Sequence, residues 1–211
     1  EYDSRKPLYF AVRENQQNAV EFLLQKGANP VDGFHEPLLQ MAKDRDNQEM
    51  LVLLKNWLRA QYRIIPEGDE IAALIQNFEI AKVLLSLQEK PELIAAADAR
   101  GNQPIQWAVM TRQWELIDWL LEHGADINAT RPDGARPLHL TNGDYHYRGW
   151  RDVPRTALRP HEVLLGFLIA RGAEYDISTA AKIGDLARVR ALLDENPALA
   201  NAVPSYSTYY S

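Results

Sequence analysis

The sequence predicts an all-α protein, a solenoid of about six helix-turn-helix repeats without an extended sheet. Apolar side chains recur at spacings of three and four residues in about ten short segments, the pattern of amphipathic helices. Pairs of such segments recur with a period of about 33 residues, which is typical of stacked helical repeats. A unit of this length cannot bury its apolar faces alone, so it needs neighbouring copies on both sides.

The most regular unit spans residues 98–129. A turn at Asp98–Gly101 leads to Pro104, whose missing N–H and fixed φ suit the first position of a helix. A short apolar helix and a polar break follow, and Gly124 ends the second helix because glycine enters the left-handed conformation without a Cβ clash. The second helix carries one apolar stripe, formed by Leu116, Ile117, Leu120 and Leu121.

Copies of this unit precede and follow it. Proline begins further first helices at Pro7, Pro37 and Pro137, and the units end in LLQKGANP, LLEHGADIN and LIARGAEYD. We therefore expect one array over the whole chain, with repeats at about 1–30, 31–62, 63–97, 98–129, 130–176 and 177–203 and a tail at 204–211.

These motifs resemble the ankyrin-repeat family, whose pattern is a turn, Thr-Pro-Leu-His, a short helix, a second helix with paired leucines, and Gly-Ala. The resemblance covers nearly the whole chain and is most specific in 98–144 and 168–201. In finer detail the chain is similar to bacterial members that carry a long insertion in one repeat. The resemblance implies a protein-binding scaffold without catalytic activity, an inference from fold analogy.

The second and third repeats depart from the pattern. Trp57–Leu58 stands where Gly-Ala is expected, so we predict that this helix continues to about Tyr62. The third repeat has no Pro-Leu start, and we expect Asp69 to cap its first helix.

The threonine that caps the first helix in the family is replaced in every clear repeat, by Lys6, Glu36, Gln103 and Arg136. The histidine of the pattern survives only as His139. Losing a cap costs about 1 kcal/mol, and we see no compensating feature in the sequence. The sequence therefore predicts a less stable array than one with the family's consensus caps.

Composition restricts the function. The net charge is −6, from 29 acidic and 23 basic residues, which argues against a general nucleic-acid binder. There are no cysteines for disulfides or metal sites. No apolar run reaches the about 18 residues that a membrane span needs. We expect a cytoplasmic protein. Because the chain starts inside a turn and its last repeat ends in a connection, we also expect it to be a fragment of an array with further repeats outside it, or a product of processing.

No catalytic or metal motif stands out among the histidines and acidic residues. Three of the five histidines, with Asp144, lie near an unusually long connection, but they lack the compact spacing of a zinc site. We find no catalytic triad spacing and no phosphate loop. The acidic cluster at Glu67–Glu70 is explained by the first turn of a helix. We therefore expect no enzyme activity, no metal and no cofactor.

The long connection at 143–160 makes the fifth repeat about 15 residues longer than one period. Aromatic and arginine side chains are common binding hot spots, and this insert contains Tyr145, His146, Tyr147, Arg148, Trp150 and Arg151. We expect the insert to fold onto the array next to His139 and to bind a partner. It could instead only cover an apolar seam, or build a site for a small anionic ligand or an enzymatic reaction.

The resemblance also implies a concave face lined by the first helices and the turns. The position three residues after the helix-start proline points there in the family, and it holds Phe10, Gln40, Trp107 and Leu140. Phe10 and Trp107 are apolar for a solvated face, and Arg100 and Asn102 lie on the neighbouring turn. We expect a partner protein to bind there, although Trp107 could instead pack against the next repeat.

Overall fold

The computed structural model describes residues 6–31, 38–143 and 161–202, and this part of the chain is helical. Strand pairing within it is limited to an isolated bridge between Ile64 and Ala97. The prediction of an all-α repeat protein without an extended sheet is therefore confirmed for the described residues. The α-helices are α1 Pro7–Arg13, α2 Gln17–Gln25, α3 Leu38–Asp44, α4 Gln48–Tyr62, α5 Pro66–Gln76, α6 Ile80–Glu89, α7 Pro104–Met110, α8 Trp114–Glu122, α9 His161–Ala170, α10 Ile177–Ile183 and α11 Leu186–Glu195. The 3-10 helices are η1 Pro91–Ala95, η2 Pro137–Leu140 and η5 Pro197–Asn201.

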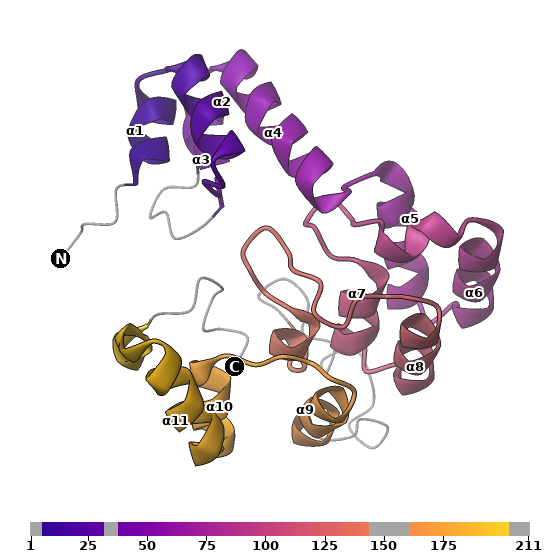
Figure 1. The fold of residues 1–211 in the computed structure, drawn as a ribbon. Helices are drawn as coiled ribbons and strands as arrows, with labels where there is room; N and C mark the ends of the chain where they lie inside the picture. The colour runs from indigo at the N-terminus through magenta and orange to yellow at the C-terminus, as the bar shows by residue number, and fades with distance from the viewer. Residues whose placement is uncertain (1–5, 32–37, 144–160, 203–211) are drawn as a thin grey trace.

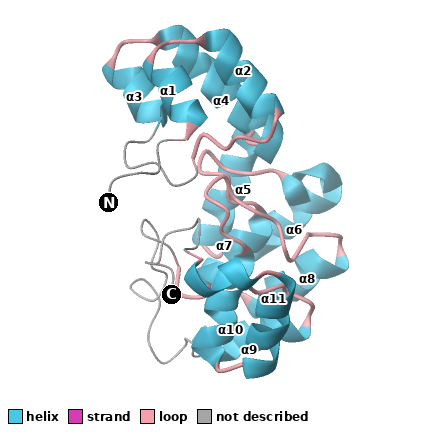
Figure 2. Cartoon of the chain, turned by 60° about the vertical axis from the view of Figure 1, so that its left-hand side comes forward, coloured by secondary structure: helices cyan, strands magenta, loops and turns pink. Residues whose placement is uncertain are grey.

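The helices follow one another in antiparallel pairs along an open curve (Figure 1). On the right of that view, α5 and α7 lie on the inner side of the curve, and α6 and α8 lie on the outer side. Figure 2 shows α1 and α3 on the same inner side, with α2 and α4 behind them. The first helix of each pair therefore lines the inside of the curve, which we call the inner face.

Proline sets the start of several inner helices. Pro7 and Pro104 stand at the first positions of α1 and α7, where no N–H is needed. Pro66 does the same for α5, so the expectation that Asp69 caps this helix is wrong. Asp69 lies one turn inside α5, and its carboxylate instead accepts a hydrogen bond from the Ala99 N–H at 2.9 Å.

The long helix α4 confirms the expectation of a continued second helix. It runs from Gln48 to Tyr62 and ends at Arg63, which adopts the left-handed conformation with φ 52°. Leu58 is buried in the added turns, where an ordinary repeat would already have stopped. The extra length carries the chain from the second repeat to the third.

The apolar side chains form two separate cores rather than one. The first core lies within α1–α4, which we call the N-terminal lobe. The second extends over α5–α9 with η1 and η2, which we call the central lobe. Beyond it, α10 buries Thr179 and Ala180, whereas α11 buries no residue.

Two connections between the lobes are seen among the described residues. After α4, the Ile65 N–H donates to the Ala97 carbonyl at 3.2 Å, and the Ala97 N–H donates to the Arg63 carbonyl at 3.0 Å. Across the inner side, the Asn29 side-chain amide donates to the Pro132 carbonyl at 2.7 Å. The turn that contains Pro132 in the fifth repeat thus reaches back to the end of the first repeat.

Candidate functional site

The turn before α7 is organised around a buried carboxylate. Asp98 is 4% exposed, and its Oδ1 accepts hydrogen bonds from the backbone N–H groups of Arg100 at 2.9 Å and Asn102 at 2.8 Å. A short side chain that bonds to backbone groups two and four residues later closes the turn locally. Arg100 itself remains exposed at the tip of this turn.

Trp107 binds the same carboxylate from the helix that follows the turn. Its indole Nε1–H donates to the Asp98 Oδ2 at 2.7 Å, and the residue is 3% exposed. All residues of α7 are buried. The structure therefore places Trp107 inside the array, and the expectation of a ring lying open on the concave face is not met. Burial fits its size and the single polar atom that needs a partner.

A buried arginine links this turn to the next one. Asn102 is buried, and its Oδ1 accepts a hydrogen bond from Arg131 Nη1 at 2.9 Å. The Arg131 guanidinium also forms an ion pair with Asp133 at 2.5 Å. The side chains of Asp98, Asn102, Trp107, Arg131 and Asp133 thus form one continuous set, which we call the turn network. The sequence predicts the turn at Asp98 and places Asn102 beside it as a binding residue, but it does not indicate that Asn102 is buried or that Asp98 and Arg131 bond to this turn.

Glutamine replaces the family's histidine in the fourth repeat. Gln106 Oε1 accepts a hydrogen bond from the Gln103 N–H at 2.6 Å, and its amide donates to the Ala129 carbonyl at 3.1 Å. His139 makes the corresponding bond in the fifth repeat, where its Nδ1 accepts from the Arg136 N–H at 3.1 Å. The expectation that nothing compensates for the lost pattern residues is therefore wrong for the fourth repeat, whereas the N-cap residue Lys6 of α1 makes no side-chain capping bond. The glutamine at the third helical position was a readable signal.

His139 is a structural histidine in this setting. Burial lowers its pKa from 6.5 to about 4; Arg136 lowers it as well, and Asp176 and Asp133 oppose the change. The ring is therefore neutral at pH 7 and can accept the Arg136 N–H. Within the described residues, no group of three or more histidine or acidic side chains is arranged to hold a metal ion.

The N-terminal lobe leaves side chains of two inner helices open to solvent. Phe10 on α1 is 40% exposed, the Arg13 guanidinium lies 5.1 Å from its ring centre, and Tyr9 packs edge-on against it. Gln40 on α3 is exposed as well, whereas Leu140 is buried. Of the predicted inner positions, Phe10 and Gln40 are accessible, while Trp107 and Leu140 belong to the core.

The predicted insert residues Tyr145, His146, Tyr147, Arg148, Trp150 and Arg151 lie outside the described residues, and so does the contact expected between the insert and His139. Their part in binding stays a prediction. In the described part of the chain, no helix is long and apolar enough to cross a membrane; the expected cytoplasmic location stays a prediction too.

Known proteins share this repeat pattern. Family models described as "Ankyrin repeat" match residues 5–32 and 100–129. The chain is 33% identical over 160 residues to the transient receptor potential cation channel subfamily A member 1 of Homo sapiens, covering 65% of this chain and 14% of that protein. It is 28% identical over 144 residues to the nuclear factor NF-kappa-B p105 subunit of Gallus gallus, covering 65% and 15%. A putative ankyrin repeat protein of Rickettsia bellii is 28% identical over 127 residues, covering 60% and 29%. The chain thus spans about a seventh of the first two relatives.

Proposed function

Because the chain belongs to the ankyrin-repeat family, whose arrays generally mediate protein–protein interactions, we propose that it is a non-catalytic scaffold that binds a partner protein on its inner face. The observation that carries this proposal is the exposed Phe10 on an inner helix, with the partly buried Tyr9 packed edge-on against it and Arg13 beside it. Aromatic and arginine side chains on a folded surface are the residues in which binding energy concentrates.

A stacked array is suited to this role for a physical reason. The helices of the N-terminal lobe are already packed around their own core, so little conformational entropy is lost when a partner binds. Phe10 lies on α1, and Gln40 lies on the neighbouring inner helix α3. A partner segment that runs along the inner face contacts both helices.

The central lobe contributes through its turn. The buried Trp107 supports Asp98 and thereby holds the loop that carries the exposed Arg100. Trp107 accordingly acts by positioning, while Arg100 contacts the partner. We propose that Arg148, Trp150 and Arg151 of the insert extend the same surface, and that the arginines meet a carboxylate-bearing protein segment, since guanidinium groups pair with carboxylates in two-bond geometry.

The test begins with capture of a partner from a native lysate and then compares two matched phenylalanines. Phe10 on the inner helix α1 makes a cation–π contact with Arg13. Phe22 on the outer helix α2 is 58% exposed and makes a cation–π contact with Lys26. We expect Phe10→Ala to weaken binding by about thirtyfold, the effect of losing one hot spot of about 2 kcal/mol. Phe22→Ala should bind within about twofold of the parent, as expected of an exposed side chain outside the interface.

Arg100→Ala and Arg148→Ala extend the comparison to the turn and the insert, with circular dichroism to confirm that each variant is folded. Equal losses for Phe10→Ala and Phe22→Ala, or no loss for any inner-face variant, would contradict the proposal. A selective loss for Phe22→Ala would move the site to the outer face.

A further inference from the structure

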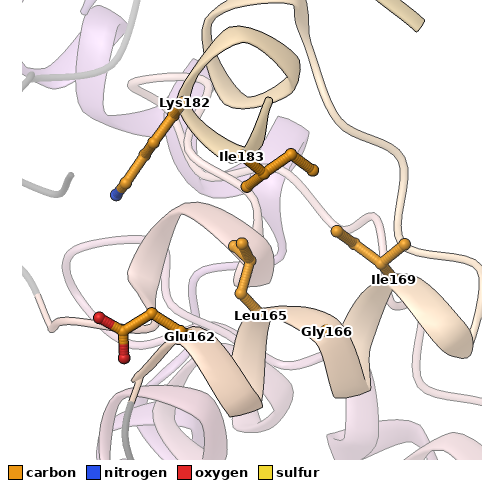
Figure 3. A pocket seen from close by; sticks show the side chains of 6 residues that line it. All are labelled: Glu162, Leu165, Gly166, Ile169, Lys182 and Ile183. Atoms are coloured by element: carbon orange, nitrogen blue, oxygen red, sulfur yellow. The ribbon is translucent and has the colours of Figure 1, made fainter. Parts of the chain in front are cut away.

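A pocket of about 420 Å³ lies between α9 and α10, away from the inner-face site. Its size falls within the range of small-molecule sites. Figure 3 shows three aliphatic side chains around one end of the pocket and the charged ends of two others on the opposite side. The lining residues are Glu162, Leu165, Gly166, Ile169, Lys182 and Ile183.

Gly166 is the first unusual feature of this pocket. It stands in the middle of α9, where glycine destabilises a helix relative to alanine. Packing does not require it, because a Cβ at this position would meet no atom within 4 Å. Gly68 in α5 is the opposite case, since a Cβ there would lie 2.1 Å from the Ala97 carbonyl oxygen. The missing side chain of Gly166 leaves the space above α9 open.

The charges at the polar end are the second feature. Glu162 already takes part in another interaction. Burial lowers the pKa of Arg112, and the negative charge of Glu162 partly opposes this decrease. Lys182 forms no ion pair in the part of the chain that the structure describes. The Lys182 ammonium therefore stands without an ion pair among the described residues, on the same side of this partly open pocket as Glu162 and beside its aliphatic wall.

We infer that this pocket binds an aliphatic carboxylate, with the carboxylate on Lys182 Nζ and the hydrocarbon lying over Gly166 between Leu165 and Ile183. The ammonium supplies a charge-assisted hydrogen bond, and the aliphatic walls bury the hydrocarbon. This site is separate from the proposed protein-binding face and does not depend on it.

Two sources supply this chemistry: a free medium-chain fatty acid, and the C-terminal aliphatic residue of a peptide. Octanoate represents the first source in the experiment, and acetyl-Ala-Ala-Leu with a free C-terminal carboxylate represents the second. Octan-1-ol and the amidated peptide are the matched controls, because they keep the aliphatic group and lack the negative charge.

The experiment titrates the full chain with each compound and follows backbone NMR shifts in α9 and α10. We expect saturable binding of octanoate or of the acid peptide, at least tenfold tighter than binding of its uncharged control. Gly166→Leu should weaken this binding at least tenfold by filling the chamber, and Lys182→Gln should weaken it about tenfold, the loss of a charged hydrogen bond.

Loss of binding by Gly166→Leu should not result from unfolding. Gly166→Leu should keep or raise the unfolding temperature, since leucine favours a helix and the Cβ finds open space. Ala81→Leu on α6 adds the same side chain to an exposed position far from the pocket and should leave binding unchanged. The inference is overturned if neither acid binds, if Gly166→Leu binds as the parent does, or if the uncharged controls bind as tightly as the acids.

Discussion

The N-terminal and central lobes both stack neighbouring repeats, but they link them with different kinds of contact. In the N-terminal lobe the links are exposed: the Asn47 amide donates to the Asn15 Oδ1 at 2.7 Å, and the Gln17 amide donates to Glu49 at 2.9 Å. In the central lobe the turn network does this work, and Asp98, Asn102 and Arg131 are buried. Exposed polar pairs contribute little to stability, whereas breaking a buried network leaves unpaired groups and costs more.

Equivalent positions in the two lobes also differ in their exposure to solvent. Phe10 and Trp107 each stand three residues after a proline that starts an inner helix. Phe10 remains partly open to solvent, while Trp107 is enclosed and bonded to Asp98. The buried polar links between repeats therefore lie in the central lobe, and the N-terminal lobe leaves Phe10 open on an inner helix.

The largest expected effect comes from breaking the turn network. Asp98→Ala removes the acceptor of the Trp107 indole N–H and of the Asn102 and Arg100 backbone N–H groups. We expect a loss of about 3 kcal/mol or more in the free energy of unfolding, measured by urea denaturation, because buried donors are left unpaired.

Gln17→Ala is the matched change in the N-terminal lobe, since it removes one exposed link between repeats, the bond from the Gln17 amide to Glu49. Its cost should stay within about 0.5 kcal/mol. Similar costs for the two variants would mean that the lobes do not differ in this way.

A pair of glycine variants sharpens the comparison at the backbone. Gly101 and Gly124 both adopt positive φ, of 85° and 93°. A Cβ on Gly101 would lie 2.2 Å from the Pro132 Cδ, whereas a Cβ on Gly124 would meet nothing within 4 Å. Gly124→Ala should cost about 1 kcal/mol for the left-handed conformation alone. Gly101→Ala should cost about 1 to 3 kcal/mol more. Thermal unfolding of both variants measures the difference. Equal decreases in the unfolding temperature would show that Pro132 does not lie close to Gly101.

His139 should make the central lobe sensitive to acid. Its folded-state pKa is lowered to about 4 by burial, so between pH 6.5 and about 4 the unfolded chain binds a proton that the folded chain does not. The free energy of unfolding should therefore fall as the pH decreases through this window, by up to about 1.4 kcal/mol per pH unit. At and above pH 7 this contribution is fully present.

His139→Gln is the informative variant, because Gln106 already performs the same capping role in the fourth repeat. The variant should stay folded at pH 7, and its unfolding free energy should depend less on pH between 6.5 and about 4. Urea denaturation of parent and variant at several pH values gives the difference between their unfolding free energies at each pH. The contribution of the acidic residues is the same in both proteins and cancels in this difference. Parallel pH profiles would show that His139 is not the responsible group.

A further modest effect concerns the bond between the lobes. Asn29→Asp keeps the oxygen that accepts the Val31 N–H but removes the donor to the Pro132 carbonyl. We expect a loss of about 1 kcal/mol, seen as a lower urea midpoint. A variant as stable as the parent would indicate that α4 and the connection that follows it hold the lobes together without this bond.

The sequence predicts those features of the fold that local patterns determine. Pro7 and Pro104 start their helices, and α4 reaches Tyr62, because start signals and the missing Gly-Ala are readable along the chain. Gln106 was readable too, as the glutamine of a capping box. The exposure of Phe10 agrees with the family pattern for the inner face.

The rest depends on contacts between distant residues. Trp107 is buried because Asp98 and the neighbouring helices enclose it, and its own spacing after Pro104 equals that of the exposed Phe10 after Pro7. The division into two cores and the reach of Pro132 to Asn29 likewise arise from three-dimensional packing, which no repeat motif encodes.

Hydrogen–deuterium exchange of the protein alone and in complex with its captured partner tests the account most directly. If the open inner face of the N-terminal lobe binds the partner, amides of α1 and α3 should exchange more slowly in the complex, while those of the outer helix α2 should be unchanged. The central lobe should already be the most protected part of the free protein, because its links are buried. Slower exchange confined to the outer helices, or a free N-terminal lobe as protected as the central lobe, would contradict the account.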